Sequence, residues 1–223
     1  MANYSIIEVK KFENELTKVE EQKNGEALQS YFKGLARTLF NKIEILAGDD
    51  RYSFAEIEFY YQNERFKGGQ YKDTYPRTKD AGNLFWHLSG IDICFETDKE
   101  KGSYYGGILI RSIVKLKADG SEDCLITGPM CCSDELLNSC VESSKNEAPA
   151  FLPILVDKEN LNIVPVEPVP ARRQGIEADK GEKALPFCFY TERSSWKNHK
   201  GYNYSACPEK RKIENNDNRR TDQ

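Results

Sequence analysis

Two carboxylates and a phenol recur at every second position within the stretch Phe54–Tyr61. Aromatic and β-branched residues are dense there, and apolar and polar residues alternate, which predicts a β-strand. Successive side chains of a strand point to opposite faces, so Glu56, Glu58 and Tyr60 share one face. The other face then carries Ala55, Ile57, Phe59 and Tyr61. If the carboxylate face meets solvent, this is an ordinary amphipathic strand. If it lines a cleft, one glutamate is a candidate general base.

A second stretch carries a charge where burial is expected. Residues 106–114 read Gly-Gly-Ile-Leu-Ile-Arg-Ser-Ile-Val, a nearly continuous apolar run that is typical of a central strand. Arg111 interrupts this run. Because an unpaired guanidinium is costly to bury, Arg111 needs a carboxylate partner. We expect Glu58 or Glu56 to be that partner across the sheet.

The rest of the chain shows helical and extended patterns that place these strands in one domain. Of 223 residues, 39% are hydrophobic and 30% charged, which suits a single globular domain with a real core over residues 1–207. Residues 208–223 lack apolar periodicity and are predicted to be a disordered tail. Helices are predicted over 8–22, over 28–40 and from Ser133, and strands over 43–46, 52–61, 84–88, 91–97, 105–116, 153–156 and 185–190.

Composition also bears on location and on cofactors. No run of about 18 apolar residues exists, so no membrane span is expected, and the first residues lack the layout of a secretory signal. Seven cysteines, an odd number without CxxC spacing, favour reduced thiols in a cytoplasmic protein. The two histidines, His87 and His199, are far apart, which argues against a zinc site. We expect neither a metal nor another cofactor.

The polar, glycine-rich stretch from Asn63 to Asn83 is a candidate for contact with nucleic acid. It brings basic and aromatic residues close together, among them Lys72, Tyr75 and Arg77. Such side chains suit phosphate and base contacts, although a solvated loop fits the composition equally well. The net charge of −4 counts mildly against polyanion binding over the whole surface, but it does not exclude a local basic groove.

Taken in order, these segments resemble the alkyladenine (3-methyladenine) DNA glycosylase family. The resemblance begins with Leu35–Leu39, similar to the family's Leu-Ala-Arg helix, and continues with Glu56–Tyr60, similar to its Glu-Thr-Glu-Ala-Tyr strand. The family's Thr-Pro-Arg and Met-Phe pair is matched by Tyr75–Arg77 with Leu84–Phe85. Its strand ending in Leu-Leu-Arg-Ala looks like Gly107–Ser112, and its Ser-Gly-Pro looks like Thr127–Pro129. Near the end, Arg172–Ile176, Pro186–Tyr190 and Ser194–Trp196 resemble three further family motifs. The match runs from about residue 28 to residue 197.

The resemblance implies a role for each matching residue. In that family the second Glu of the strand activates the water that displaces a damaged base from C1′, a role that would fall to Glu58. The Tyr two residues later, here Tyr60, stacks on the flipped-out base, and the Arg of the central strand, here Arg111, lies beside the catalytic Glu. Extrahelical presentation is required because the anomeric carbon cannot be reached within the stack.

The implied protein is a monofunctional hydrolase, since no Lys is placed to form a Schiff base. It would excise alkylated or deaminated purines from damaged duplex DNA in base-excision repair, as a monomer without metal or cofactor. The pattern and the resemblance together predict an α+β fold, a single domain with a curved, mostly antiparallel β-sheet and flanking helices.

The chain departs from the family's pattern at the base-binding side, where Tyr60, Glu56, His87 and Glu96 are expected. The family's loop His is missing from residues 62–80, and Glu96 stands where an Asn gates the pocket. In the run Phe85–Gly90, His87 could stack on the base, but only Leu88 or Ser89 is available at the position of the side chain that wedges into the duplex. The alternative hypothesis is therefore a non-catalytic nucleic-acid- or nucleotide-binding relative with a degenerate pocket.

Overall fold

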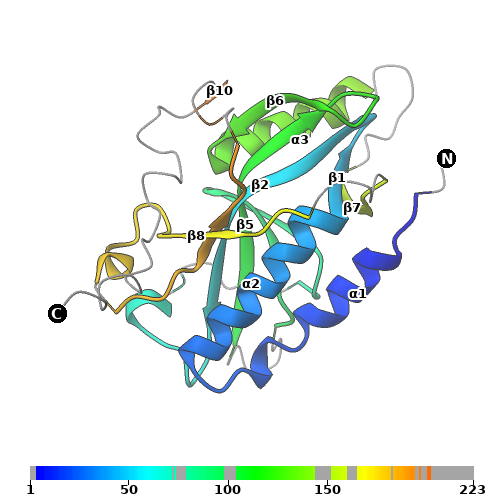
Figure 1. Ribbon diagram of the computed structural model, residues 1–223. Coiled ribbons are helices and arrows are strands. Elements are labelled where there is room, and N and C mark those ends of the chain that lie inside the picture. The colour runs from blue at the N-terminus through cyan, green and yellow to red at the C-terminus, as the bar shows by residue number, and fades with distance from the viewer. Residues whose placement is uncertain are drawn as a thin grey trace.

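In the residues that the structure describes, a curled, mostly antiparallel sheet carries three α-helices (Figure 1). The computed structural model describes residues 4–71, 73, 79–97, 104–143, 152–159, 165–181, 183–193, 196 and 200–201. The helices are α1 (Ile7–Leu16), α2 (Gly25–Lys42) and α3 (Pro129–Ser143). The strands are β1 (Ile43–Ala47), β2 (Asp50–Gln62), β3 (Leu84–His87), β4 (Gly90–Cys94), β5 (Tyr105–Leu116), β6 (Glu122–Thr127), β7 (Ile154–Asp157), β8 (Val169–Ala171), β9 (Cys188–Tyr190) and β10 (Lys200–Gly201). The predicted α+β class with a curved sheet is confirmed.

The two longest strands, β2 and β5, form the centre of the sheet. The order runs β10–β6–β5–β2–β1–β7, with β4 also beside β5 and β9 also beside β2. β3 extends the sheet from β4, and β8 extends it from β9. Every described pair is antiparallel except β10 with β6. β1 and β2 form the expected hairpin.

Helices α1 and α2 lie side by side across one face of the sheet (Figure 1). The spacing of apolar residues explains α2, because Leu28, Phe32, Leu35 and Leu39 recur on one side of the helix and are all buried. Asn24 begins this helix, since its side-chain oxygen accepts a hydrogen bond from the Ala27 N–H at 2.8 Å. The ring of Phe32 stacks on Phe59 of β2, with centroids 4.5 Å apart.

Strand β2 is buried on both faces, and its packing corrects one prediction. Ile57, Phe59 and Tyr61 join the large core under the helices, as the period of two predicts. Ala55 does not join them, because it packs with Tyr190 and other residues in a separate small core on the opposite face. The reason is an irregularity in the pairing of β2 with β5, located between Phe54 and Ile57, which shifts the alternation.

Other element boundaries also differ from the sequence-based prediction; the strand predicted over 91–97 ends at Cys94, and the one predicted over 185–190 begins at Cys188. Helix α3 begins at Pro129, four residues before Ser133, because Gly128 adopts a positive φ of 96° and donates its N–H to the Arg111 carbonyl at 2.8 Å. Proline is well suited to the first turn, where its missing N–H costs nothing.

Strand β6 was not predicted, since its N-terminal half is polar and exposed. The predicted helix over 8–22 ends at Leu16, followed by a 3₁₀ turn over Val19–Glu21.

None of the helices that the structure describes is long and apolar enough to cross a membrane. The tail predicted over residues 208–223 lies outside the described residues.

Candidate active site

Both central strands change their neighbours at the same place along the sheet. On one edge of β2, β1 pairs with Asp50–Ser53 and β9 pairs with Glu56–Glu58. On the outer edge of β5, the pairing changes from β4 to β6 between Leu109 and Ser112. At this place the pairing of β2 with β5 passes over one residue in each strand, Ala55 in β2 and Arg111 in β5. Each strand therefore carries a bulge. Bulges redirect side chains and are common next to functional sites.

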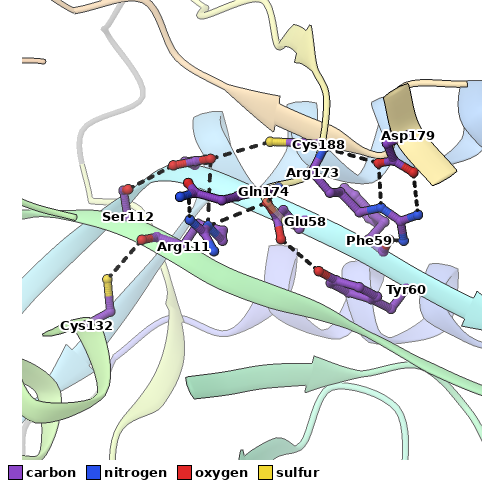
Figure 2. A network of polar contacts seen from close by, with 11 residues as sticks. Glu58, Phe59, Tyr60, Arg111, Ser112, Cys132, Arg173, Gln174, Asp179 and Cys188 are labelled. Atoms are coloured by element: carbon purple, nitrogen blue, oxygen red, sulfur yellow. Dashed lines mark hydrogen bonds and ion pairs between the residues drawn. The ribbon is translucent and has the colours of Figure 1, made fainter. Parts of the chain in front are cut away.

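Glu58 lies at this point and is entirely enclosed. Its side chain has 0% of its surface exposed. One carboxylate oxygen, Oε1, accepts a hydrogen bond from the Gln174 backbone N–H at 2.7 Å, and the other, Oε2, accepts one from the Tyr60 hydroxyl at 2.8 Å (Figure 2). The solvent-facing interpretation of this strand face is therefore wrong for Glu58, and it is wrong also for Glu56, which is buried.

Arg111 provides the cation that these two carboxylates require. Its Nε atom lies 3.5 Å from Oε1 of Glu58 and 3.8 Å from Oε1 of Glu56, so the predicted pairing is confirmed with both candidates. Its Nη2 atom donates a hydrogen bond to the side-chain oxygen of Gln174 at 2.9 Å. The guanidinium thus faces two carboxylates and also contacts the residue that covers Glu58.

Glu56 is held from two neighbouring strands. Its Oε2 atom accepts a hydrogen bond from the Ser112 hydroxyl at 3.1 Å, and the thiol of Cys188 donates to its Oε1 atom at 3.6 Å. Both contacts connect β2 to its neighbours, β5 and β9. Since burial of a charge without such contacts is strongly unfavourable, they account for a carboxylate at this depth.

Tyr60 is placed between Glu58 and a second arginine. Burial, and secondly the negative charge of Glu58, raise the pKa of the Tyr60 hydroxyl well above its usual value, so the group remains a proton donor. The guanidinium of Arg173 lies 4.8 Å from the centroid of the Tyr60 ring. Arg173 is itself fixed by Asp179, which accepts hydrogen bonds from Nε at 2.9 Å and from Nη2 at 2.8 Å (Figure 2). One face of the tyrosine ring is therefore covered by a cation.

The ligand atoms of Glu56, Glu58 and Cys188 lie within 4.8 Å of one another, which is a spacing that could hold a metal ion. In the described part of the chain this is the one such group. Arg111 already brings a positive charge to both carboxylates, and a metal ion at the same place would be repelled by the guanidinium. The arrangement is better suited to pairing the two carboxylates with an arginine than to binding a cation.

The remaining predicted site residues lie on other strands or outside the described part. His87, at the end of β3, contacts Asp92 of β4, and its Nδ1 atom accepts a hydrogen bond from the Ser89 N–H at 3.2 Å. Glu96, half-buried after β4, accepts a hydrogen bond from the Ala81 N–H at 3.3 Å. The three residues predicted to contact DNA, Lys72, Tyr75 and Arg77, lie outside the described residues.

Sequence reasoning did not assign a role to Gln174, Arg173 or Cys188, although all three contact the site. The run Arg172–Ile176 was noticed for its family resemblance, and it is the run that provides the covering backbone N–H and the arginine beside Tyr60. Asp92 was also missed, despite its place on the polar side of β4. Leu109 of β5 pairs in register with both Glu58 and Asp92, so these two acids lie on the same face of the sheet.

Two open surface cavities lie away from this site, around the β1–β2 turn and the end of β7. One is about 240 Å³ in volume. They share Arg51, Lys158 and Glu159 among their lining residues, and Arg51 is paired with Glu159 and with the buried Glu44. The charged residues of these cavities are already paired with one another, so a bound ligand is not needed to explain them. The Glu58 site therefore remains the candidate active site.

No protein-family model matches the chain. A protein of Acanthamoeba polyphaga mimivirus, described as uncharacterized, is 30% identical over 129 aligned positions, which cover 49% of this chain and 57% of the viral protein. The match therefore spans little more than half the length of that relative.

Proposed function

We propose that the chain is a DNA-glycosylase-like hydrolase that excises alkylated or deaminated purines from DNA. One observation carries the proposal: Glu58, Tyr60 and Arg111 meet in a single contact network at the bulge between β2 and β5. These are the three positions to which the family resemblance assigns the water-activating Glu, the base-stacking Tyr and the neighbouring Arg. Six of the cysteines are free thiols in the described chain, which fits the proposed cytoplasmic location.

The chemistry of the proposed reaction needs a carboxylate of this kind. The bond from C1′ to the purine nitrogen breaks and its electron pair leaves with the base, so positive charge develops on the sugar. Glu58 would stabilise that charge and accept a proton from the water whose oxygen forms the new bond to C1′. The hydrogen bonds from Tyr60 and Gln174 would fix the direction in which the carboxylate points, so little reorganisation is needed during the reaction.

The β3–β4 hairpin supports an interaction with the DNA stack. Its tip carries Leu88, with 89% of its surface exposed. Proteins that distort duplex DNA often insert an apolar side chain between base steps. Leu88 is thus the proposed wedge. Damaged duplex DNA is the proposed partner, and Lys72, Tyr75 and Arg77 remain proposed DNA contacts.

A second candidate function is supported by the enclosure of Glu58. Both of its oxygens accept hydrogen bonds from the protein, and none of its side-chain surface is exposed. A carboxylate that serves only to neutralise Arg111 would show the same contacts. This favours a non-catalytic relative that binds nucleic acid, in which the network is structural.

Release of 3-methyladenine and of hypoxanthine from duplex DNA, measured for the wild type and for Glu58→Gln, separates the two functions. For a hydrolase we expect the substitution to lower the release rate by roughly 10²–10⁴-fold, the range typical of lost general-base catalysis. Glu44→Gln is the matched control, because Glu44 is a buried strand carboxylate that is paired with Arg51 at 2.8 Å, on β1. Release that survives Glu58→Gln removes Glu58 from the mechanism. Binding without release by the wild type favours the second function.

A further inference from the structure

We infer that His87 and Asp92 form a positioning pair that holds Leu88 in a fixed, outward-pointing place at the tip of the β3–β4 hairpin. The inference rests on the proposed function, because it assigns the pair to the insertion of Leu88 into a duplex. It gives His87 a different role from the base stacking that the sequence predicted. The pair would act through Leu88 and would touch neither the sugar nor the leaving base.

The imidazole of His87 connects the turn to the neighbouring strand. Its Nδ1 atom accepts a hydrogen bond from the Ser89 N–H at 3.2 Å, within the two-residue turn that contains Leu88. Because Nδ1 accepts this hydrogen bond, we place the ring N–H on Nε2. That nitrogen lies 3.0 Å from Oδ2 of Asp92. Both ring nitrogens therefore contact the hairpin itself.

Asp92 itself has a fixed position in the sheet. It is fully buried in β4, and its register partners are Phe85 on β3 and Leu109 on β5. The ring of His87 also stacks on Phe85, with centroids 5.8 Å apart and an interplanar angle of 25°. The imidazole thus has a carboxylate 3.0 Å from its edge and an aromatic ring stacked on its face, which limits its rotation.

Gly90 fixes the other side of the tip. Its φ of 138° is strained for other residues, and a Cβ atom at this position would lie 2.7 Å from Cβ of Pro129, the first residue of α3. The hairpin therefore packs directly on the start of a helix. Leu88 lies between this contact and the His87 contact, yet it is exposed over 89% of its surface.

A rigid tip would keep the apolar side chain of Leu88 in one outward place before any duplex is bound. A side chain that is held outward before binding loses less conformational freedom when it enters the stack. Fixing the backbone on both sides of Leu88 is therefore a way to make one leucine an effective wedge.

The first test measures base unstacking without requiring chemistry. A duplex that carries 2-aminopurine beside the target base becomes more fluorescent when that base unstacks. We expect the wild type to raise the fluorescence, and Leu88→Ala and His87→Ala each to lose at least three quarters of the rise. Leu152→Ala is the matched control, because Leu152 is also an exposed leucine, at 65%, and precedes the edge strand β7. It should behave as the wild type.

The second test examines the contact itself. In nitrogen-15 NMR spectra, with His199→Gln used to assign the signals, His87 should show a proton on Nε2 and none on Nδ1. The Ser89 amide should exchange with solvent at least tenfold faster in His87→Ala than in Leu88→Ala. Asp92→Asn, which keeps an oxygen facing Nε2, should retain the fluorescence rise, whereas Asp92→Ala should lose it. Thermal unfolding shows whether each variant is folded.

The outcomes are distinct from those for the proposed hydrolysis. A fluorescence rise without base release would sink the hydrolase while leaving the positioning pair intact. The inference is overturned by three results: no rise with the wild type, a rise that survives His87→Ala, or a Nδ1-protonated tautomer. The tautomer measurement needs only the wild-type fold, so it decides the question even where Asp92→Ala does not fold.

Discussion

Two buried arginines contact the Glu58–Tyr60 pair, Arg111 at the glutamate and Arg173 at the tyrosine ring, and their geometries differ. Arg173 meets Asp179 in a bidentate contact, with distances of 2.9 and 2.8 Å, and donates a third hydrogen bond to the Phe59 carbonyl at 3.0 Å. Arg111 stands 3.5 and 3.8 Å from Glu58 and Glu56, and so divides its charge between two carboxylates.

The difference indicates that two buried arginine–carboxylate contacts can have different roles. A bidentate pair with short hydrogen bonds is strong and directional, which suits an element that fixes the positions of its surroundings. Burial disfavours the charged form of Arg173, but the contacts with Asp179 outweigh burial and raise the pKa of the guanidinium above its usual value. A cation that two carboxylates share over longer distances can shift towards either of them. It can therefore adjust when the charge on one carboxylate changes during a reaction. We therefore regard Arg173 as structural and Arg111 as part of the site.

The largest expected effect is on stability, from Arg173→Met. This change leaves Asp179 buried without its cation, and we expect the free energy of unfolding to fall by about 3–5 kcal/mol in urea denaturation. Arg172→Met, at the exposed neighbouring position, should change it by less than about 0.5 kcal/mol. The double variant Arg173→Met with Asp179→Leu should recover most of the loss. If it does not, Arg173 matters for more than its ion pair.

A smaller effect, on activity, is expected for Tyr60→Phe. Hydrogen bonds to charged groups contribute about 1.5–3 kcal/mol, so loss of the hydroxyl that bonds Glu58 should slow base release by roughly tenfold or more. Tyr61→Phe makes the same chemical change one residue later, where the hydroxyl bonds Glu20 on the other face of the strand. Equal rates for the two variants would contradict a special role for the polar face.

The smallest effect concerns Asp157, a carboxylate outside both arginine networks. It accepts hydrogen bonds from the Ser5 hydroxyl and from the N–H groups of Ile7 and Val9 at the start of α1. Burial alone would raise the pKa of this carboxyl, but these hydrogen bonds outweigh burial and lower it below the usual value.

Because of this lowered pKa, the contribution of Asp157 to the stability of the fold depends on pH. A lowered folded-state pKa stabilises the fold above the unfolded-state pKa near 4, and this contribution is lost as the pH falls through the folded-state value. Asp157→Ala should cost about 1 kcal/mol at pH 7, the usual contribution of such a cap, and less at pH 2. Urea denaturation at both values checks this; an equal cost at both would show that packing, not charge, is responsible.

Much of the fold follows from local patterns, but the site only partly does. The alternation in β2 was sufficient to predict a strand and the apolar run in β5 a central strand, and the need of Arg111 for a carboxylate was sufficient to predict its partners. The bulge was not predictable, because Ala55 fits the regular period as well as it fits the irregular one. Gln174 could not be found either, since it lies 116 positions from Glu58 along the chain and contacts it through a backbone N–H that every residue but proline has.

The long separations within the network determine when it can form. β9 pairs with β2 from 130 or more positions away, and the Gln174 backbone reaches Glu58 from nearly as far. Contacts of high sequence separation close large loops and are slow to form. During synthesis β2 and β5 leave the ribosome well before residues 173–190, so the two carboxylates stay in water until the later strands arrive. Enclosure of Glu58 is thus a late event of folding, and a nascent chain cannot carry the site before its final third has been made.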